Sequence, residues 1–457
     1  MSRRQPAAGR LRSMARAATT DMAVNSFWLM TSSIVNMALS LFVVAIAARY
    51  FGPETFGRFS YALSLVVLFT AISTLGLETL TVANLVSGSN RQSDVVGTSL
   101  ILRLVGGVVL TAVAVATVSV LEPRDPGLQV LVALLSLMMV LKSIDVIDYW
   151  FQSRLLGKTA SVIKMASYAI AALLKIWLIR SGGSIYEYAA IYALDALLVG
   201  VGFAVAYRRL NSNDARWSFD ANYAKDVLGK SWYIMLSGLM ATLYMRVDQV
   251  MLGYMYEDKS VLGVYAAAIT LSSIWYFIPM AVIASSNPII MRAKLGKPSR
   301  YAEYVQDLFT VTAWIGIGFS TLIAACADLL VWLVYGSEFS EAASILRISV
   351  FAGVFALLGS ARGAWLVCEG LQRYSLWYIG GGAIVNICLN LYLIPIMGAH
   401  GAALATLVAQ AAAVLLIPSL FRETRVSTKM MVRALSIRRA YLLVQRVLRG
   451  PGPAASG

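Results

Sequence analysis

The sequence predicts an all-α polytopic membrane protein with about twelve transmembrane helices in two six-helix lobes. Hydrophobic residues make up 59% of the chain and charged residues 13%, whereas soluble domains carry about 25% charged residues. Apolar stretches of about 20 residues, the length that crosses a bilayer as a helix, recur along the chain. No strand-like alternation of polar and apolar residues is visible, and helices satisfy their own backbone hydrogen bonds in lipid.

The apolar stretches define the expected spans and the segments between them. The spans are expected at residues 24–48, 58–86, 96–120, 127–152, 160–180, 185–207, 228–254, 261–290, 308–333, 343–368, 374–397 and 399–421. They divide the chain into a disordered basic leader (1–22), a first lobe (23–207), an interlobe loop (208–227), a second lobe (228–421) and a basic tail (422–457). Within the tail, apolar residues from Ile437 to Leu448 recur at helical spacing among arginines, which predicts a short helix on the membrane surface.

The net charge of +15 is explained by membrane topology. If the N-terminus is cytoplasmic, 27 of the 38 Lys and Arg residues fall in inner connections and only five in outer ones. This asymmetry follows the positive-inside rule and places both termini in the cytoplasm. With an odd number of spans, the basic connections would no longer fall consistently on one side of the membrane. The basic residues therefore do not indicate a nucleic-acid partner.

A weak internal repeat supports the division into two lobes. The segment Phe56–Ala62 (FGRFSYA) opens the second span, and Leu262–Ala268 (LGVYAAA) opens the eighth, 206 residues later. Six spans separate the two copies, so both lobes have the same orientation in the membrane. Transporters built from such halves place their substrate between them.

Enzyme and metal signatures are missing from the sequence. No phosphate-binding glycine loop, nucleophile elbow or paired zinc-binding histidines occur. The three cysteines and the single histidine, His400, stand apart from one another, which predicts neither a metal site nor a cofactor. No expected connection between spans is long enough to hold an ATPase domain. The sequence thus predicts a secondary transporter or facilitator that is not an enzyme.

Several short motifs, in order along the chain, resemble those of one transporter family. They are Arg49–Ser60 (RYFGPETFGRFS), Tyr149–Gln152 (YWFQ), Tyr335–Ser340 (YGSEFS), Asn390–Pro395 (NLYLIP) and Gly398–Thr406 (GAHGAALAT). The set resembles the Wzx-type O-antigen and exopolysaccharide flippases of the multidrug/oligosaccharidyl-lipid/polysaccharide (MOP) superfamily. Residues 228–290 also resemble the seventh and eighth helices of these flippases.

The resemblance implies a function in polysaccharide biosynthesis. It implies a MATE-like bundle that carries undecaprenyl-diphosphate-linked oligosaccharide from the inner to the outer leaflet of a bacterial plasma membrane by alternating access. Membrane lipids, a polysaccharide polymerase and a chain-length regulator are the further partners implied. Two alternatives stay open: a cation-coupled multidrug antiporter of the same superfamily, and a non-transporting scaffold of a polysaccharide assembly complex. Lipid II flippases are near relatives that usually carry additional helices.

Basic residues inside the expected spans are the candidate ligands for a lipid diphosphate. Burying a charge in a membrane costs several kcal/mol, so such residues usually face a partner or a watered cavity. Arg246 lies deepest and is either a diphosphate ligand, to which its donor fork is suited, or an ion-pair partner. The remaining candidates are Arg362, expected inside the bundle, Arg103, for which snorkelling is the alternative, and Lys142, for which pairing with Asp145 is the alternative.

Other embedded charges receive different interpretations. Asp145, Asp148 and Asp248 are candidates for coupling transport to a proton or sodium gradient, since they lie deep in their spans. Lys175, Arg347 and Asp328 lie near the outer ends of spans, where an interfacial position is the simpler interpretation. Pro279, Pro288 and Pro395 are expected to interrupt helices and to provide bending points.

Overall fold

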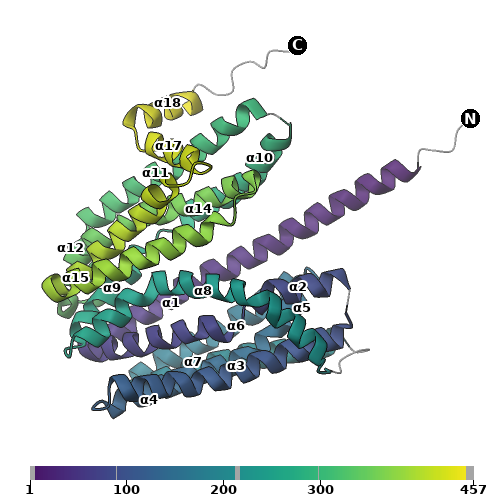
Figure 1. Ribbon diagram of the computed structural model, residues 1–457. Coiled ribbons are helices and arrows are strands. Elements are labelled where there is room, and N and C mark those ends of the chain that lie inside the picture. Colours follow the sequence, from purple (N-terminus) through teal and green to yellow (C-terminus); the bar gives the residue numbers. More distant parts are fainter. Residues whose placement is uncertain (1–5, 89, 212–216, 297, 449–457) are drawn as a thin grey trace, which may run out of the picture. The chain divides into compact units, whose positions relative to one another are not determined.

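The structure, a computed structural model, describes residues 6–88, 90–211, 217–296 and 298–448, and all regular elements in these ranges are helices (Figure 1). The chain divides into two compact units. The first comprises Met1–Tyr50 and Ala62–Leu239, and the second comprises Phe51–Tyr61 and Met240–Gly457. The expected all-α class is confirmed.

The described residues contain long apolar helices at many of the expected positions, and several of these helices are broken. Eight segments are long and apolar enough to cross a membrane. Two of these, Met30–Ser87 and Tyr374–Ser419, turn back at a glycine with non-helical backbone angles, Gly52 (φ 75°) and Gly398 (φ 56°), and so hold two spans each. The pair Ser260–Ser272 and Phe277–Gly296, bent by 43°, forms another span. Helix α8 (Ala221–Met255), which contains the span expected at 228–254, is not among the helices that meet this criterion.

The first unit is built around antiparallel helices. Its elements are α1 (Pro6–Ser73, without Phe51–Tyr61), α2 (Leu77–Ser87), α3 (Gln92–Leu121), α4 (Pro126–Leu141), the 3₁₀ turn η1 (Lys142–Asp145), α5 (Val146–Ser153), α6 (Gly157–Arg180), α7 (Ile185–Leu210) and the first part of α8 (Ala221–Met255). Helix α3 packs on α4, α4 on α7, and α7 on α6. A core that includes Trp150, Phe151 and Phe203 joins α5 to α7.

The second unit continues from Met240 in α8. Its further elements are α9 (Ser260–Ser272), α10 (Phe277–Gly296), α11 (Pro298–Ala325), α12 (Ala327–Tyr335), η2 (Ser337–Phe339), α13 (Ala342–Ser349), α14 (Ala352–Glu369), α15 (Tyr374–Ala411), the π-helix η3 (Ala412–Leu416), α16 (Ile417–Ser419), α17 (Arg425–Ala434) and α18 (Ile437–Leu448). Helix α11 packs on both α10 and α14. Phe309, Leu358 and Trp365 belong to the core of this unit.

Three expectations about segments differ from the structure. The leader was expected to be disordered, but α1 begins at Pro6, so residues 6–22 are helical and residues 1–5 lie outside the described part. The boundary between the units falls within α8 and not in the 208–227 loop, of which residues 212–216 are also outside the described part. Pro288 and Pro395 lie inside helices, and the chain turns at glycines instead.

The boundary is displaced because the start of α8 packs on the first unit. Asn84 Nδ2 donates to the hydroxyl oxygen of Tyr223 at 3.2 Å, and the backbone N–H of Asp220 donates to Thr98 Oγ1 at 2.9 Å. Farther along, Gly76 approaches α8 so closely that a Cβ there would lie 2.7 Å from the backbone nitrogen of Met235. These contacts tie residues up to Leu239 to the first unit.

The two copies of the internal repeat contact each other within the second unit. A Cβ on Gly57 would lie 1.8 Å from the carbonyl oxygen of Lys259, and a Cβ on Gly263 would lie 1.9 Å from that of Pro53. The glycines are 206 residues apart, and so are Pro53 and Lys259. Each glycine therefore touches the carbonyl four residues before the other, which is the reciprocal pattern of a two-fold contact.

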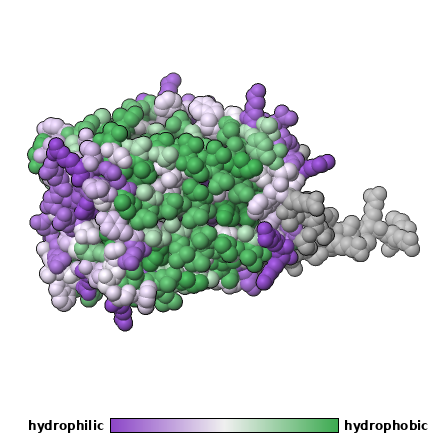
Figure 2. Space-filling view, turned by 90° about the horizontal axis from the view of Figure 1, so that it is seen from below, coloured by the Kyte–Doolittle hydropathy of each residue, from purple (hydrophilic) through white to green (hydrophobic). Residues whose placement is uncertain are grey.

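The surface of the first unit has the character of a lipid-facing protein. On the face shown in Figure 2, hydrophobic side chains cover a broad central area and hydrophilic ones gather toward both ends. Exposed apolar side chains line α3 from Ile101 to Val120, with Val105 55% and Val120 79% exposed. Water would not favour this exposure, whereas a bilayer would. The protein is a multi-pass membrane protein.

Candidate functional site

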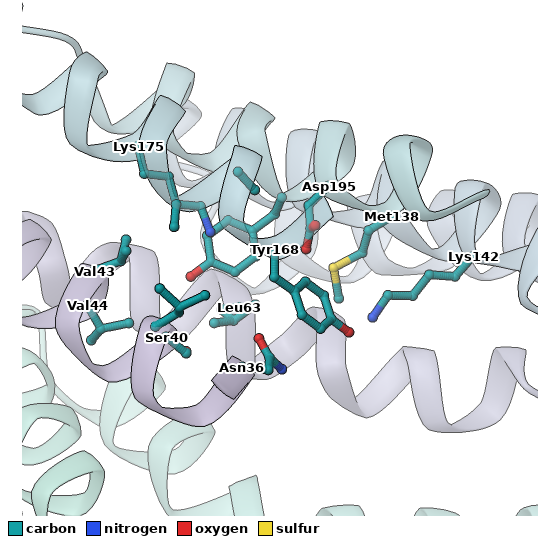
Figure 3. A pocket seen from close by; sticks show the side chains of 14 residues that line it. Asn36, Ser40, Val43, Val44, Leu63, Met138, Lys142, Tyr168, Lys175 and Asp195 are labelled. Carbon is teal, nitrogen blue, oxygen red and sulfur yellow. The ribbon is translucent and has the colours of Figure 1, made fainter. Parts of the chain in front are cut away.

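A cavity of about 270 Å³ lies within the first unit, between α1, α4, η1, α6 and α7 (Figure 3). Helical spacing explains why its polar side chains share one space, since residues three, four or seven apart lie on one helix face. The polar and charged side chains that line it are Asn36 and Ser40 of α1, Lys142 of η1, Tyr168 and Lys175 of α6, and Tyr192 and Asp195 of α7.

The charges of this cavity are not paired with one another. The ammonium nitrogen of Lys175 lies 3.5 Å from the ring centroid of Tyr192, a cation–π contact that fixes the side chain toward the cavity. Among the described residues, Lys142 and Asp195 make no ion pair within 4.0 Å, and Asp195 Oδ1 is buried without a hydrogen-bond donor. An ion pair of Lys142 with Asp145, the alternative interpretation of Lys142, is also not found among the described residues. The cavity therefore has donors available for a polar or anionic ligand.

Arg103 lies elsewhere in the first unit and is almost completely buried, at 4% exposure. Its Nη1 donates to the hydroxyl oxygen of Tyr149 at 2.8 Å, and its Nε has no acceptor among the described residues. Because the guanidinium is enclosed, the snorkelling alternative is wrong. Its position beside α5 does not bring it to the cavity of Figure 3.

The aspartates of the first unit have different surroundings. Asp148 is buried and forms an ion pair with Lys164 at 2.9 Å, and Gln152 Nε2 donates to the same carboxylate at 3.2 Å. A carboxylate held by a cation in this way is a structural partner of α6. Asp145 ends η1 and makes no ion pair among the described residues.

A second polar cluster, which we call the Asp248 network, is buried in the second unit. Asp248, 4% exposed, accepts hydrogen bonds from the hydroxyl of Tyr265, from Thr406 Oγ1 at 3.3 Å and from the backbone N–H of Gln249 at 2.8 Å. The network extends along α15, where Asn386 Nδ2 donates to Thr406 Oγ1 at 3.2 Å and Asn390 Nδ2 donates to Asn386 Oδ1 at 2.9 Å.

The turn of α15 at Gly398 assembles this network. Asn386 and Asn390 precede the turn and Thr406 follows it, so the two arms of α15 must fold against each other to bring them together. Gly401 permits this approach, because a Cβ there would lie 2.3 Å from the carbonyl oxygen of Leu393. Asn390 Oδ1 is buried and has no donor among the described residues. A buried carboxylate can bind a proton. Carboxylate and amide oxygens together are also ligands that hard cations prefer.

Arg246 and Arg362, both candidate diphosphate ligands, have partners in the second unit. Arg246 is half-buried, and its Nη1 donates to Gln249 Oε1 at 3.3 Å on the same helix. Arg362 is 2% exposed and donates from Nη2 to the carbonyl oxygen of Val414 and to Met431 Sδ. Val414 belongs to the π-helix η3, a helix form whose widened turn leaves carbonyls needing other donors.

Sequence reasoning found some of these residues and missed others. It singled out Lys142 and Asp248, which lie at the cavity and at the centre of the network. It assigned Lys175 to the membrane interface and gave no role to Tyr168, Tyr192, Tyr265, Asn386, Asn390 or Thr406. The only local signal for the last group was Asn386 and Asn390 at i and i+4 in an apolar span. Arg362 is buried, as expected of a residue inside the bundle, its Nε has no acceptor among the described residues, and its role as a diphosphate ligand stays a prediction.

The family follows from a direct comparison. Residues 22–294 match the model of the polysaccharide biosynthesis protein family. The chain belongs to this family. Residues 234–393 also match the MatE family model. Membership of the superfamily is thereby confirmed, and the Wzx branch stays a prediction.

The fold is shared with solved transporters. The lipid II flippase MurJ in an inward closed conformation superimposes with a TM-score of 0.67 and 12% identity, over 93% of each chain. An inward-facing multidrug resistance MATE family transporter superimposes with a TM-score of 0.58 and 14% identity, over 91% of this chain and 95% of that one. A MOP superfamily transporter from Pyrococcus furiosus superimposes with a TM-score of 0.57 and 13% identity, over 92% of this chain and 96% of that one. At these identities the likeness is one of fold.

One curated relative is a flippase. The probable flippase AglR of Haloferax volcanii is 30% identical over 188 residues, which are 39% of this chain and 38% of AglR. The match thus spans well under half of that protein.

Proposed function

We propose that this protein flips undecaprenyl-diphosphate-linked oligosaccharide from the cytoplasmic to the periplasmic leaflet, by alternating access, for polysaccharide biosynthesis. The observation that carries the proposal is the cavity in the first unit, where Lys142 and Lys175 face a polar space inside a membrane protein of the polysaccharide biosynthesis family. Two ammonium groups against the single carboxylate of Asp195 favour an anionic ligand. The flippase AglR supports the reaction type.

The other lining groups suit the remainder of such a cargo. A diphosphate needs cationic donors, while sugar hydroxyls need both donors and acceptors. Asn36, Ser40 and Asp195 provide these at the cavity wall, and Tyr168 adds an aromatic face. Such polar groups are costly in hydrocarbon unless they serve a pathway.

The test is lipid flipping by the full-length protein in proteoliposomes. Fluorescent undecaprenyl-diphosphate oligosaccharide is placed in both leaflets, and loss of protection from an impermeant quencher reports flipping. Lys142→Gln/Lys175→Gln should slow flipping by about tenfold or more, since each charge-assisted hydrogen bond contributes about 1.5–3 kcal/mol. Lys230→Gln is the control, because Lys230 is exposed and forms an ion pair with Asp226 on the surface of α8.

The same assay separates the alternatives. A multidrug antiporter would expel a cationic dye against a proton or sodium gradient and leave the lipid-linked sugar unflipped. A scaffold would do neither. An unchanged flipping rate in Lys142→Gln/Lys175→Gln would show that the cavity does not bind the cargo during transport.

We also propose that Asp248 couples transport to a proton or sodium gradient. Its carboxylate lies in a closed network of hydroxyl and amide groups. A cation bound there would replace the hydrogen bonds that now hold Tyr265 and Thr406, and so would change how α8, α9 and α15 pack. Asp145 and Asp148 stay further candidates, and Asp148 is ion-paired with Lys164 at 2.9 Å.

The proposal includes an orientation with both termini in the cytoplasm, supported by the distribution of Lys and Arg. Reporter fusions at Gly52, Lys259 and Gly398 should then be periplasmic, and those at Gly88 and Lys297 cytoplasmic. The polymerase and the chain-length regulator are partners to be sought by crosslinking in cells. The protein is proposed to act as a transporter and not as an enzyme.

A further inference from the structure

The C-terminal helices α17 and α18 form a basic arm whose base is fixed to the second unit. Helix α17 presents Ser427, Met430, Met431 and Ala434 to the core. Gln306 Nε2 donates to the carbonyl oxygen of Met430 at 2.9 Å, and Trp314 Nε1 donates to that of Ala434 at 3.1 Å. The second bond satisfies a carbonyl at the end of α17, which no helical N–H could reach. These bonds, both from α11, hold α17 in one orientation.

The outward side of α17 combines charge with apolar surface. Lys429 and Arg433 are exposed, and so are Val426 (56%) and Val432 (55%). Over residues 422–457 the basic residues are Arg422, Arg425, Lys429, Arg433, Arg438, Arg439, Arg446 and Arg449, and the one acidic residue is Glu423. Such a one-sided charge on a helix that follows the last span is complementary to an anionic surface.

Helix α18 continues the same pattern. It contacts α11 and α17, yet Ile437 is 75% exposed and Tyr441, one turn later on the same face, is 61% exposed. Arg438 is exposed beside them. An apolar stripe flanked by arginines is typical of a helix that lies in the headgroup region with its apolar side toward the acyl chains.

We propose that α17 and α18 bind anionic phospholipids of the leaflet next to them, with arginines on the lipid phosphates and with Ile437 and Tyr441 inserted between headgroups. Charge complementarity selects the lipid, because neutral headgroups would leave this density of arginine uncompensated. Since α17 is bonded to α11 and approaches Arg362 of α14 through Met431, the arm ties these helices to the membrane surface. This inference is independent of the cargo.

The arm can be tested in the full-length protein. Cys326, Cys368 and Cys388 are replaced by Ala, and Tyr441→Cys carries an environment-sensitive fluorophore. The labelled protein is reconstituted in phosphatidylcholine alone or in equal parts of phosphatidylcholine and phosphatidylglycerol, each with brominated acyl chains as quenchers. We expect strong quenching only with phosphatidylglycerol, and its loss at high salt, which screens the charges.

Arg438→Gln/Arg439→Gln should shift the equilibrium away from the quenched state by about fivefold for each arginine, from about 1 kcal/mol per surface charge. Arg124→Gln/Arg180→Gln, an exposed pair far from α18 in the sequence, is the matched control and should have no effect. Equal quenching in both lipid mixtures, no quenching in either, or indifference to Arg438→Gln/Arg439→Gln would overturn the proposal.

Discussion

The two units of this protein differ in their buried polar groups. The first unit holds an open cavity with two lysines and a single aspartate, whereas the second encloses an aspartate in the Asp248 network. At the 206-residue offset of the repeat, Asp248 corresponds to Phe42 and Tyr265 to Phe59. Where the first copy has rings without a polar atom, the second has a carboxylate and its donor. Under the proposed function, the cavity of the first unit would bind the anionic part of the cargo and the Asp248 network of the second unit would bind the coupling cation.

The shared part of the repeat should be the least tolerant of change. Gly263→Ala would place a methyl group against the carbonyl of Pro53, and backbone there cannot move aside. We expect a loss of about 3 kcal/mol or more of stability, the upper range for overpacking, seen as loss of folded protein in detergent. Gly57→Ala should behave alike, because the contact is reciprocal.

A glycine in open space provides the control for that prediction. Gly380 in α15 has nothing within 4 Å of an added Cβ, so Gly380→Ala should be neutral or stabilising by up to about 1 kcal/mol. If Gly263→Ala and Gly380→Ala have the same thermal midpoint by fluorescence-detected gel filtration, the close contact between Gly263 and Pro53 does not contribute to the stability of the protein.

Asp248→Asn tests the division of roles between the units. The amide keeps the shape of the carboxylate but cannot exchange a proton or balance Na⁺. We expect cargo binding within about twofold of wild type and complete loss of acceleration by an imposed ion gradient in proteoliposomes. Wild-type protein that flips at one rate with and without proton and sodium gradients would leave the Asp248 network as a helix-pairing device.

Arg246→Ala asks whether anion recognition is confined to the first unit. If Arg246 binds the diphosphate, its loss should weaken cargo affinity by about tenfold, as expected for one charge-assisted hydrogen bond. Arg246→Lys should restore part of that affinity, since it provides charge without the planar fork. Normal cargo affinity in the Ala variant would show that Arg246, which donates to Gln249, does not bind the diphosphate.

Tyr265→Phe, the mildest change, gives the second copy the residue of the first. It removes one donor to Asp248 and leaves Thr406 and the Gln249 backbone in place. We expect the ion concentration that half-activates flipping to shift by about tenfold at most, with the maximal rate unchanged. Tyr244→Phe is the control, because the Tyr244 hydroxyl has no hydrogen-bond partner among the described residues. Equal effects of the two substitutions would show that the Tyr265 hydroxyl is not specific to coupling.

Much of the fold could be predicted from sequence because span length and hydropathy are local properties. The turns at Gly52 and Gly398 fall where the apolar stretches were separated, and Asp248 was recognised from its depth in its span. The site was predicted less well. Lys175 was assigned to the interface, since its position along α6 is visible in the sequence but the direction of its side chain, toward Tyr192 of α7, is not.

The sequence by itself determined the all-α membrane class, the uneven distribution of positive charge and the family, because each depends on composition or on short motifs. Only the tertiary structure decided which polar groups meet. The pairing of Gly57 with Gly263, the meeting of Asn386 with Thr406 across the Gly398 turn, and the burial of Arg362 on the carbonyl of Val414 all join residues far apart or on opposite arms of a turn. The physical reason is that an apolar span fixes only that a helix crosses the membrane, whereas its rotation and its neighbours are set by packing and by the need to satisfy buried polar atoms.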